Sequence, residues 1–143
     1  MSYRITGTGS CIPDITKKNS DFLENKFLDT DGGKFQTSNS EIIDKFNSIT
    51  GIYERRYAPD EINCSDLAAV AAGLAINDSK LDQETLDYII VAHNTGDISC
   101  SSGQVDTLPS VASKVKAKLK IKNPNCVAYD IICGCPGWVE GII

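Results

Sequence analysis

The stretch Val127-Ala-Tyr-Asp-Ile-Ile-Cys-Gly-Cys-Pro-Gly-Trp138 decides the fold class of this chain. A short apolar run ends abruptly in CGCPG, and apolar residues resume at Trp138. The pattern predicts a buried strand that enters a tight turn and then a helix. Pro136 suits the first turn of that helix, because its missing N–H would have no partner there anyway. Cys135 is therefore expected at a helix N-terminus, where amide hydrogens and the helix dipole favour a thiolate that can carry an acyl group.

Strands and helices alternate along the rest of the chain. Strands are expected at residues 3–8, 86–92 and 126–132, and helices at 20–27, 41–47 and 66–78 and from Pro109 onward. Ser65 is the expected N-cap of the helix at 66–78, and residues 94–107 are expected to form a loop. The continuous apolar run at 86–92 is typical of a strand buried on both faces of a parallel sheet. The order predicts an α/β fold with a mostly parallel mixed sheet flanked by helices.

Length and composition limit the classes of protein to consider. The 143 residues, of which 41% are hydrophobic, suffice for one compact domain with its own core. A net charge of −5 gives no reason to expect nucleic acid as a partner. The N-terminus lacks the apolar stretch of a signal peptide, and no run reaches the roughly 18 apolar residues of a membrane span. The expected location is therefore the cytoplasm, with no membrane partner.

Six cysteines raise the question of disulfides and metals. Without export, reduced thiols are expected. The pair Cys133 and Cys135 has one residue between its members, which is not the spacing of a zinc hook, and no second pair completes a site. We therefore expect no metal and no cofactor, and we interpret the other five cysteines as small core or loop residues.

Six segments together resemble the N-terminal half of the thiolase-like condensing enzymes, with 3-oxoacyl-[acyl-carrier-protein] synthase III the nearest group. They occur in the family's order and cover nearly the whole chain: residues 5–13 (ITGTGSCIP), 50–58 (TGIYERRYA), 65–69 (SDLAA), 87–92 (DYIIVA), 108–113 (LPSVAS) and 128–137 (AYDIICGCPG). In the family's motif the nucleophilic cysteine follows the aspartate of the preceding strand by five residues. Counting from Asp130, this resemblance assigns the nucleophile to Cys135 and not to Cys133.

The resemblance implies an acyltransferase that transfers an acyl group to Cys135 and then condenses it with a malonyl- or ketoacyl-carrier substrate. It also implies that residues 1–143 are a truncated N-terminal thiolase-like domain, because family members have roughly twice this length. Their general-base histidine and oxyanion-binding asparagine belong to the second half. The chain is accordingly expected to be a fragment, a proteolysed product or one piece of a split enzyme, and to be inactive alone. The resemblance further implies a homodimer that pairs a strand near 86–93 or 126–132.

Two further residues are assigned to substrate binding by the resemblance. Thr50 lies where relatives bind the coenzyme A nucleotide, but their adenine-stacking tryptophan is missing here and Ile49 replaces their arginine. These changes favour a donor bound to acyl carrier protein over a coenzyme A thioester. Leu108 precedes the Pro-Ser pair at the position that reaches into the partner subunit's acyl tunnel in relatives. Its alternative role is a loop leucine that caps the chain's own core.

Other charged and polar residues leave alternatives open. Arg55 and Arg56 form either structural ion pairs or part of an anion site. The lysines at 114, 116, 118, 120 and 122 form either a solvated helix face or a surface for an acidic carrier protein. His93, the single histidine, is interpreted as a strand-end side chain and not as the catalytic base. The alternative function is a non-catalytic half-subunit or scaffold of a condensing-enzyme assembly. A hydrolase is disfavoured, because the Gly-x-Ser-x-Gly signature is missing.

Overall fold

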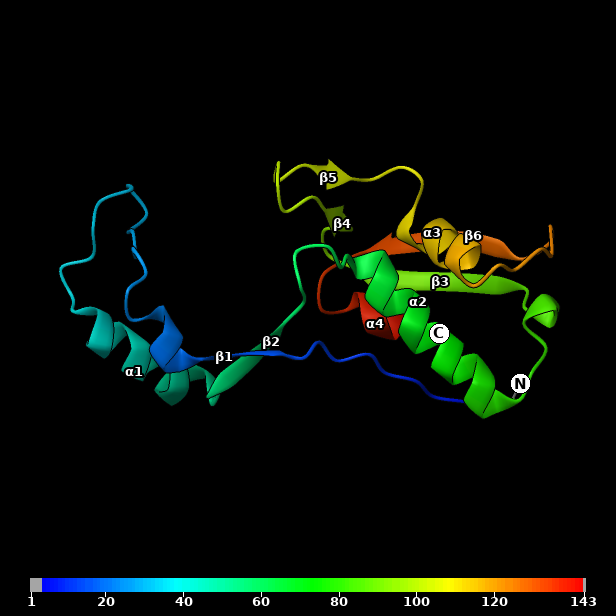
Figure 1. The fold of residues 1–143 in the computed structure, drawn as a ribbon, viewed down its shortest axis with the longest axis horizontal. Helices are drawn as coiled ribbons and strands as arrows, with labels where there is room; N and C mark the ends of the chain where they lie inside the picture. Colours follow the sequence, from blue (N-terminus) through cyan, green and yellow to red (C-terminus); the bar gives the residue numbers. More distant parts are fainter. Residues whose placement is uncertain (1–3, 143) are drawn as a thin grey trace. The chain divides into compact units, whose positions relative to one another are not determined.

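The computed structural model describes residues 4–142. The chain forms two compact units. The larger unit contains residues 4–12 and 60–142, and the smaller one contains residues 13–59. The stretch at 127–138 belongs to the larger unit, whose fold positions the candidate site (Figure 1).

The larger unit is built on two parallel strands. Strand β3 (Tyr88–His93) pairs with β6 (Val127–Ile132), and the register runs from Tyr88 opposite Val127 to His93 opposite Ile132. Both strands are rich in β-branched and aromatic residues, which favour this conformation. Their pairing confirms the prediction that the two apolar runs belong to one sheet, and the predicted α/β class is confirmed.

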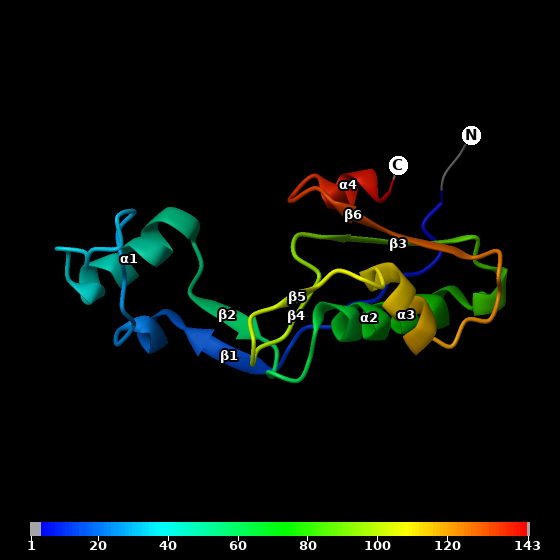
Figure 2. The same ribbon diagram turned by 90° about the horizontal axis from the view of Figure 1, so that it is seen from above.

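Helices lie on both faces of this sheet (Figure 2). Helix α2 (Cys64–Ser79) and helix α3 (Val111–Lys118) lie on one face, and helix α4 (Gly137–Glu140) lies on the other. A side chain at Gly137 would contact Ala92 and Ile131, which are opposite each other in the register and so point to the same face. The largest fully buried side chains are those of Val111 and Val115 in helix α3.

The start of helix α2 differs from the prediction. Its N-cap is Asn63 and not Ser65, and the Asp66 carboxylate accepts a 2.9 Å hydrogen bond from the Asn63 backbone N–H. Ser65 is buried in the first turn, where its backbone N–H donates to Asp97 over 2.8 Å. Asp66 stabilises this helix start in two ways. Its carboxylate accepts a hydrogen bond from the N-cap backbone, and its negative charge lies near the positive end of the helix dipole.

Residues 4–12 also differ from the prediction. The strand expected at 3–8 is not formed by its described residues, while Tyr3 lies outside them. The segment instead lies against helix α2, with the Thr8 backbone N–H donating to Asp78 over 2.9 Å. Added Cβ atoms on Gly7 and Gly9 would overlap backbone atoms of Ala75 and of other α2 residues. The two glycines therefore permit a close approach of backbone to helix, which a strand pattern does not reveal.

Gly9→Ala is expected to lower the free energy of unfolding by about 2–3 kcal/mol, because the new methyl group must displace the backbone of helix α2 at Ala71 and Ala75. Urea unfolding followed by circular dichroism measures the loss. Ser10→Ala is the matched control: Ser10 is exposed, so its change should stay within about 0.5 kcal/mol. Equal losses in the two variants would contradict the packing of residues 4–12 on helix α2.

A hairpin interrupts the loop expected at 94–107. Strand β4 (Asp97–Ile98) pairs antiparallel with β5 (Val105–Asp106). The hairpin is joined to helix α3 by the Lys114 ammonium, which lies 3.1 Å from Asp97 Oδ2 and 2.8 Å from Asp106 Oδ2. The 3₁₀ helix η2 (Gln83–Thr85) completes the unit, and Glu84 accepts hydrogen bonds from the backbone N–H groups of residues 122 and 123.

The smaller unit pairs β1 (Ile15–Lys18) antiparallel with β2 (Glu54–Tyr57). It also contains the 3₁₀ helix η1 (Asn19–Phe22) and helix α1 (Asn39–Thr50), which is longer than the predicted 41–47. Ser38 caps the start of α1, and Gly51 ends it with a left-handed φ of 68°.

Among residues 4–142, no helix is long and apolar enough to cross a membrane.

Candidate active site

Cys135 lies in the turn between strand β6 and helix α4, and its residue is exposed. Gly134 adopts a left-handed φ of 63°, and its carbonyl accepts a 3.1 Å hydrogen bond from the Gly137 N–H. Pro136 is the N-cap of α4, with a φ of −67° that any helix start accepts. The sequence prediction of strand, tight turn and helix start is therefore confirmed in outline, with Cys135 immediately before the cap. Its catalytic role stays a prediction.

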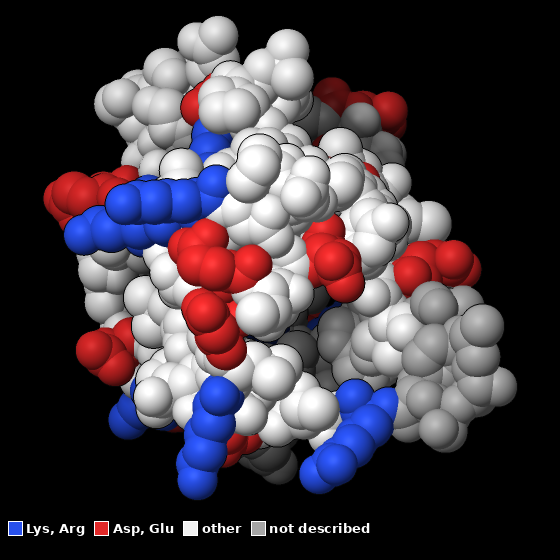
Figure 3. All heavy atoms as spheres, turned by 90° about the vertical axis from the view of Figure 1, so that its right-hand side faces the viewer, with Lys and Arg blue, Asp and Glu red and all other residues white. Residues whose placement is uncertain are grey.

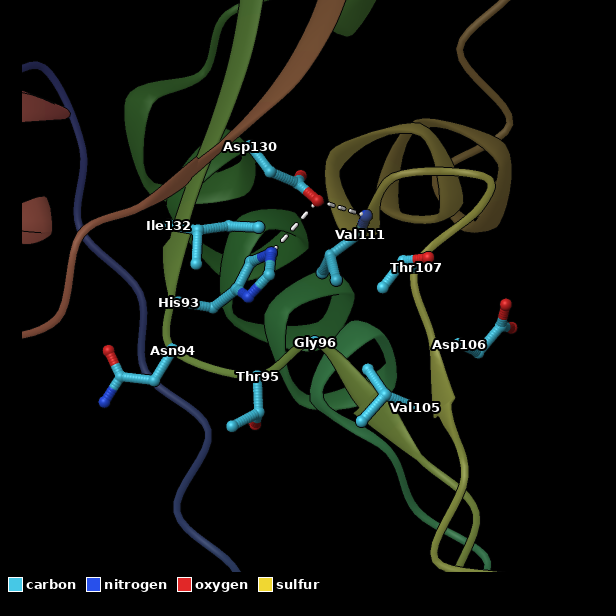
Figure 4. Close-up of a pocket in the computed structure, with 10 residues that line it drawn as sticks. All are labelled: His93, Asn94, Thr95, Gly96, Val105, Asp106, Thr107, Val111, Asp130 and Ile132. Carbon is cyan, nitrogen blue, oxygen red and sulfur yellow. Dashed lines mark hydrogen bonds and ion pairs between the residues drawn. The ribbon is translucent and has the colours of Figure 1, made fainter.

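Asp130, five residues before Cys135, fixes the strand that leads to this turn. Its carboxylate accepts hydrogen bonds from the backbone N–H groups of Val111 and Ala112, each at 2.7 Å. These are the first two residues of helix α3, whose N–H groups have no partner within the helix. Nε2 of His93 lies 3.0 Å from the same carboxylate (Figure 4). Asp130 thus joins both strands of the sheet to the start of a helix.

The surroundings of Asp130 favour its charged form. Burial raises the pKa of this carboxyl group, but hydrogen bonds from His93, Ala112 and Val111 outweigh burial and hold the pKa below its ordinary value of 3.8. The pKa of Asp97 is also lowered, because hydrogen bonds from Ser65 and Lys114 outweigh its burial.

These depressed carboxyl pKa values predict how stability depends on pH. A carboxyl group with a lowered pKa in the folded state stabilises the fold above its unfolded pKa and loses that contribution as the pH falls through its folded pKa. The contribution of these two carboxyl groups to the free energy of unfolding should therefore be constant above about pH 5 and fall as the pH drops below 3.8, the ordinary aspartate value. Urea titrations at several pH values measure it. In Asp97→Asn the fall should be shallower, and an unchanged fall would contradict the assignment to Asp97.

His93 is directed away from the helix that follows Cys135. Its neighbour Ala92 faces helix α4, so alternation along β3 directs His93 to the opposite face, towards helix α3 and Asp130. The imidazole is 7% exposed. This position is compatible with the interpretation of His93 as a strand-end residue that does not act as the base for Cys135.

Thr50 and Arg55 lie in the smaller unit and already have local partners. The Thr50 hydroxyl donates to the Phe46 carbonyl and accepts a 3.1 Å hydrogen bond from the Ile52 N–H, so it stabilises the end of helix α1. The Arg55 guanidinium lies over the rings of Phe22 and Phe46, 5.6 and 5.4 Å from their centroids. Arg55 is held by these cation–π contacts and by a 2.7 Å hydrogen bond to Asn19, whereas Arg56 forms the expected ion pair, 3.6 Å from Glu54.

Leu108 lies in the segment before helix α3, and it is 83% exposed. It does not cap the chain's own core, so the structural alternative for this residue is wrong. Its expected role in substrate binding stays a prediction.

The lysines of helix α3 do not form a free basic surface. Lys114 pairs with Asp97 and Asp106, and Lys116 donates to backbone carbonyls over 2.7 and 2.8 Å. Lys118 lies 2.6 Å from Asp66. On the face shown in Figure 3, acidic and basic side chains are interspersed. Three of the five lysines in the run therefore have intramolecular partners, and Lys114 is not part of a solvated face, since its side chain is 14% exposed. The docking surface for an acidic carrier protein stays a prediction.

Comparison with known proteins shows which proteins the chain resembles. No family model matches the chain. The chain is 36% identical over 142 residues to beta-ketoacyl-[acyl-carrier-protein] synthase III 1 of Vibrio parahaemolyticus, which covers 99% of this chain and 38% of that protein. The beta-ketoacyl-[acyl-carrier-protein] synthase III of Acholeplasma laidlawii is 34% identical over 142 residues, which is 99% of this chain and 39% of that protein. The predicted resemblance to synthase III is confirmed.

Solved structures agree with this resemblance. The 3-oxoacyl-[acyl-carrier-protein] synthase III of Aquifex aeolicus superposes with a TM-score of 0.69 at 31% identity, over 97% of this chain and 37% of that one. A variant of Xanthomonas campestris OleA superposes with a TM-score of 0.72 at 21% identity, over 96% of this chain and 35% of that one, and this likeness shows the fold alone. The chain spans about two fifths of the length of the curated synthase III relatives.

Among residues 4–142, no group of three or more His, Cys, Asp or Glu side chains is placed to hold a metal ion. Sequence reasoning missed one buried polar network, in which Asp97 joins Ser65 and Lys114. Asp97 lies in a polar stretch that carries no periodic pattern, so the sequence contains no signal that would have revealed its burial.

Proposed function

We propose that Cys135 is the acyl-carrying nucleophile of a 3-oxoacyl-[acyl-carrier-protein] synthase III in fatty acid or polyketide-type biosynthesis. The observation that carries the proposal is the exposed Cys135 thiol in the turn after strand β6, five residues beyond Asp130. The names of the relatives, beta-ketoacyl-[acyl-carrier-protein] synthase III, support the reaction class. The cytoplasmic location expected from the sequence stays a prediction.

The proposed reaction has two steps. In the first, the Cys135 thiolate attacks the carbonyl of an acyl thioester, the acyl group moves to Cys135, and the carrier thiolate leaves and takes up a proton. In the second, a malonyl thioester loses CO₂, and the resulting carbanion attacks the Cys135 thioester. The C–S bond to Cys135 breaks, and a 3-oxoacyl thioester leaves. The backbone N–H of Cys135 would contribute half of an oxyanion hole.

The remaining groups of this mechanism are proposed to come from residues outside the 143-residue chain. His93 is committed to Asp130 through Nε2, so it does not supply the general base. The family's general-base histidine and oxyanion-binding asparagine would complete the site. We therefore propose that the 143-residue chain does not catalyse condensation by itself.

The acyl donor is proposed to be bound to acyl carrier protein. Coenzyme A binding at Thr50 is disfavoured because its hydroxyl is used at the end of helix α1 and because Ile49, 78% exposed, offers no charge to a phosphate. The exposure of Leu108 supports its proposed contact with another surface, the acyl tunnel of a partner subunit. Exposed apolar side chains on the sheet, among them Tyr88, Tyr129 and Ile132, also support a homodimer.

Mass spectrometry after incubation of the full-length protein with acyl thioesters tests the proposal. Acylation should be found on Cys135, while Cys133, which is also exposed, serves as an internal control. Acylation of Cys133 instead would show that the wrong cysteine was assigned.

Fast, selective alkylation of Cys135 by iodoacetamide would favour the enzyme over a non-catalytic scaffold. Cys64 should react slowly, because burial, followed by the charges of Asp97 and Asp130, raises the pKa of its thiol.

A further inference from the structure

Two exposed thiols lie on either side of one glycine in the turn that links strand β6 to helix α4 (Figure 2). They belong to Cys133 and Cys135, and both are free. Cys100, the third exposed cysteine, lies in the loop of the β4–β5 hairpin and has no second cysteine close to it in the sequence. The function proposed above uses Cys135 alone and gives no role to Cys133.

The side chain of Cys133 begins on the same face of the sheet as helix α4. Its Cβ lies 3.7 Å from a Cβ built on Gly137, the first residue of that helix. The preceding residue, Ile132, belongs to the exposed apolar surface that supports a homodimer, but alternation along the strand directs it to the opposite face. Cys133 is therefore on the side to which the turn with Cys135 leads, and not in that surface.

The turn brings the two cysteines within the span of a disulfide. Two residues of fully extended chain cover at most about 7 Å, whereas the Cα atoms of a disulfide are usually about 4.4–6.8 Å apart. Gly134 departs from extended backbone with a left-handed φ of 63°, and its carbonyl accepts a 3.1 Å hydrogen bond from the Gly137 N–H. The chain therefore bends at Gly134, which shortens the span between the cysteines.

Gly134 also leaves room for the two sulfur atoms to meet. In the part of the chain that the structure describes, no atom beyond its two neighbouring residues lies within 4 Å of a Cβ built on Gly134. Glycine permits backbone conformations that other residues avoid, so the two flanking residues can turn towards each other at low cost. Open space and a permissive backbone thus occur between two exposed thiols.

We propose that Cys133 and Cys135 form a reversible disulfide when the protein meets a hydroperoxide. Cys135 reacts first, a step that rests on the function proposed for it. Its thiolate attacks one oxygen of the peroxide, the O–O bond breaks, and the released hydroxide or alkoxide takes up a proton. The Cys133 thiol then attacks the sulfur of the sulfenic acid, the S–O bond breaks, and hydroxide leaves with the thiol proton as water. The two sulfur atoms lose two electrons in all, and the peroxide gains them.

The disulfide has two consequences for acyl transfer. Cys135 in a disulfide has no thiolate, so acylation stops until a dithiol reductant restores the pair by thiol–disulfide exchange. Cys133 also protects Cys135, because a sulfenic acid without a neighbouring thiol is oxidised further to sulfinic acid, which dithiols do not reverse. The pair is thus a redox site that switches acyl transfer off and preserves the nucleophile.

Mass spectrometry of the full-length protein tests the disulfide. After brief treatment with hydrogen peroxide the mass should fall by about 2 Da, neither Cys133 nor Cys135 should react with iodoacetamide, and dithiothreitol should restore both thiols. Acyl-enzyme formation should fall at least about tenfold with peroxide and return with dithiothreitol. Oxygen added to Cys135 while Cys133 still reacts with iodoacetamide would overturn the proposal, and so would a disulfide from either residue to another cysteine.

Two variants are matched comparisons. Cys133→Ala should show no loss of mass; its Cys135 should gain about 32 Da as a sulfinic acid, and dithiothreitol should not restore acylation. Cys100→Ala, which removes the other exposed thiol, should form the disulfide as the unsubstituted protein does. Acylation that is lost and restored equally in Cys133→Ala and in the unsubstituted protein would overturn the role of Cys133.

The same measurements separate this proposal from the one for acyl transfer. A disulfide between Cys133 and Cys135 in a protein whose reduced Cys135 accepts no acyl group would support the redox site and reject the acyl nucleophile. Acylation of reduced Cys135 without any disulfide after peroxide would leave the acyl function in place and overturn the redox site.

Discussion

Cys135→Ala is expected to abolish both acylation and condensation in the full-length protein. Alanine has no nucleophile, so no acyl-enzyme can form, and the condensation rate should fall by about a thousandfold or more. Because Cys135 is exposed and outside the core, the free energy of unfolding should change by less than about 0.5 kcal/mol. Radiolabelled malonyl incorporation measures the rate, and intact mass measures the acyl-enzyme.

Cys133→Ala is the matched control for this experiment. Cys133 is exposed in the same turn, two residues earlier, and should retain most of the activity when changed. Full loss of activity in Cys133→Ala with normal activity in Cys135→Ala would reverse the assignment. Normal condensation in both variants would remove the proposed covalent intermediate altogether, and the scaffold function would then be favoured.

Asp130→Ala is expected to have the largest effect on stability. Its side chain is 12% exposed, and it is the acceptor for the backbone N–H groups of Val111 and Ala112 as well as for His93. Each buried donor that loses its acceptor costs about 1–3 kcal/mol, so the free energy of unfolding should fall by about 3 kcal/mol or more. Urea unfolding monitored by circular dichroism measures the change.

The comparison with Asp87 separates a lost interaction from a lost charge. Asp87 is an exposed aspartate directly before strand β3, and Asp87→Ala should change the free energy of unfolding by less than about 0.5 kcal/mol. Asp130→Asn, which keeps an acceptor oxygen but loses the charge, should give an intermediate loss. A loss for Asp130→Ala as small as that for Asp87→Ala would contradict the role of Asp130 in joining β6 to helix α3.

The sequence predicted best where one physical signal dominated. The apolar run at 86–92 predicted a strand of a parallel sheet, and β3 does pair in parallel with β6. The predicted burial on both faces is wrong for the described chain, because no residue of β3 is fully buried. Pro136 marked the start of helix α4 for a local steric reason that needs no tertiary context. The turn that holds Cys135 has the predicted form, while the role of Cys135 as nucleophile, taken from the spacing of a family motif, stays a prediction.

The sequence failed where tertiary contacts decide the conformation. The alternation near Ile5 is compatible with a strand, but Gly7 and Gly9 permit backbone contact with helix α2 instead. The N-cap of α2 was misplaced by two residues because Asp66, and not a serine, closes its first turn. Lys114 pairs with two aspartates of the β4–β5 hairpin, and no periodic pattern in the sequence predicts this hairpin. The sequence therefore left the lysine run open to two interpretations.

Asp130 also bears on how descendants of this chain should diverge. The aspartate stabilises the start of helix α3 whatever happens at the thiol, whereas nothing in the fold requires sulfur at position 135. A lineage that abandoned the chemistry should therefore keep the aspartate and let the cysteine drift. Under the role proposed for Cys135, the aspartate then indicates only that the scaffold was inherited, and the cysteine indicates a lineage still selected for catalysis.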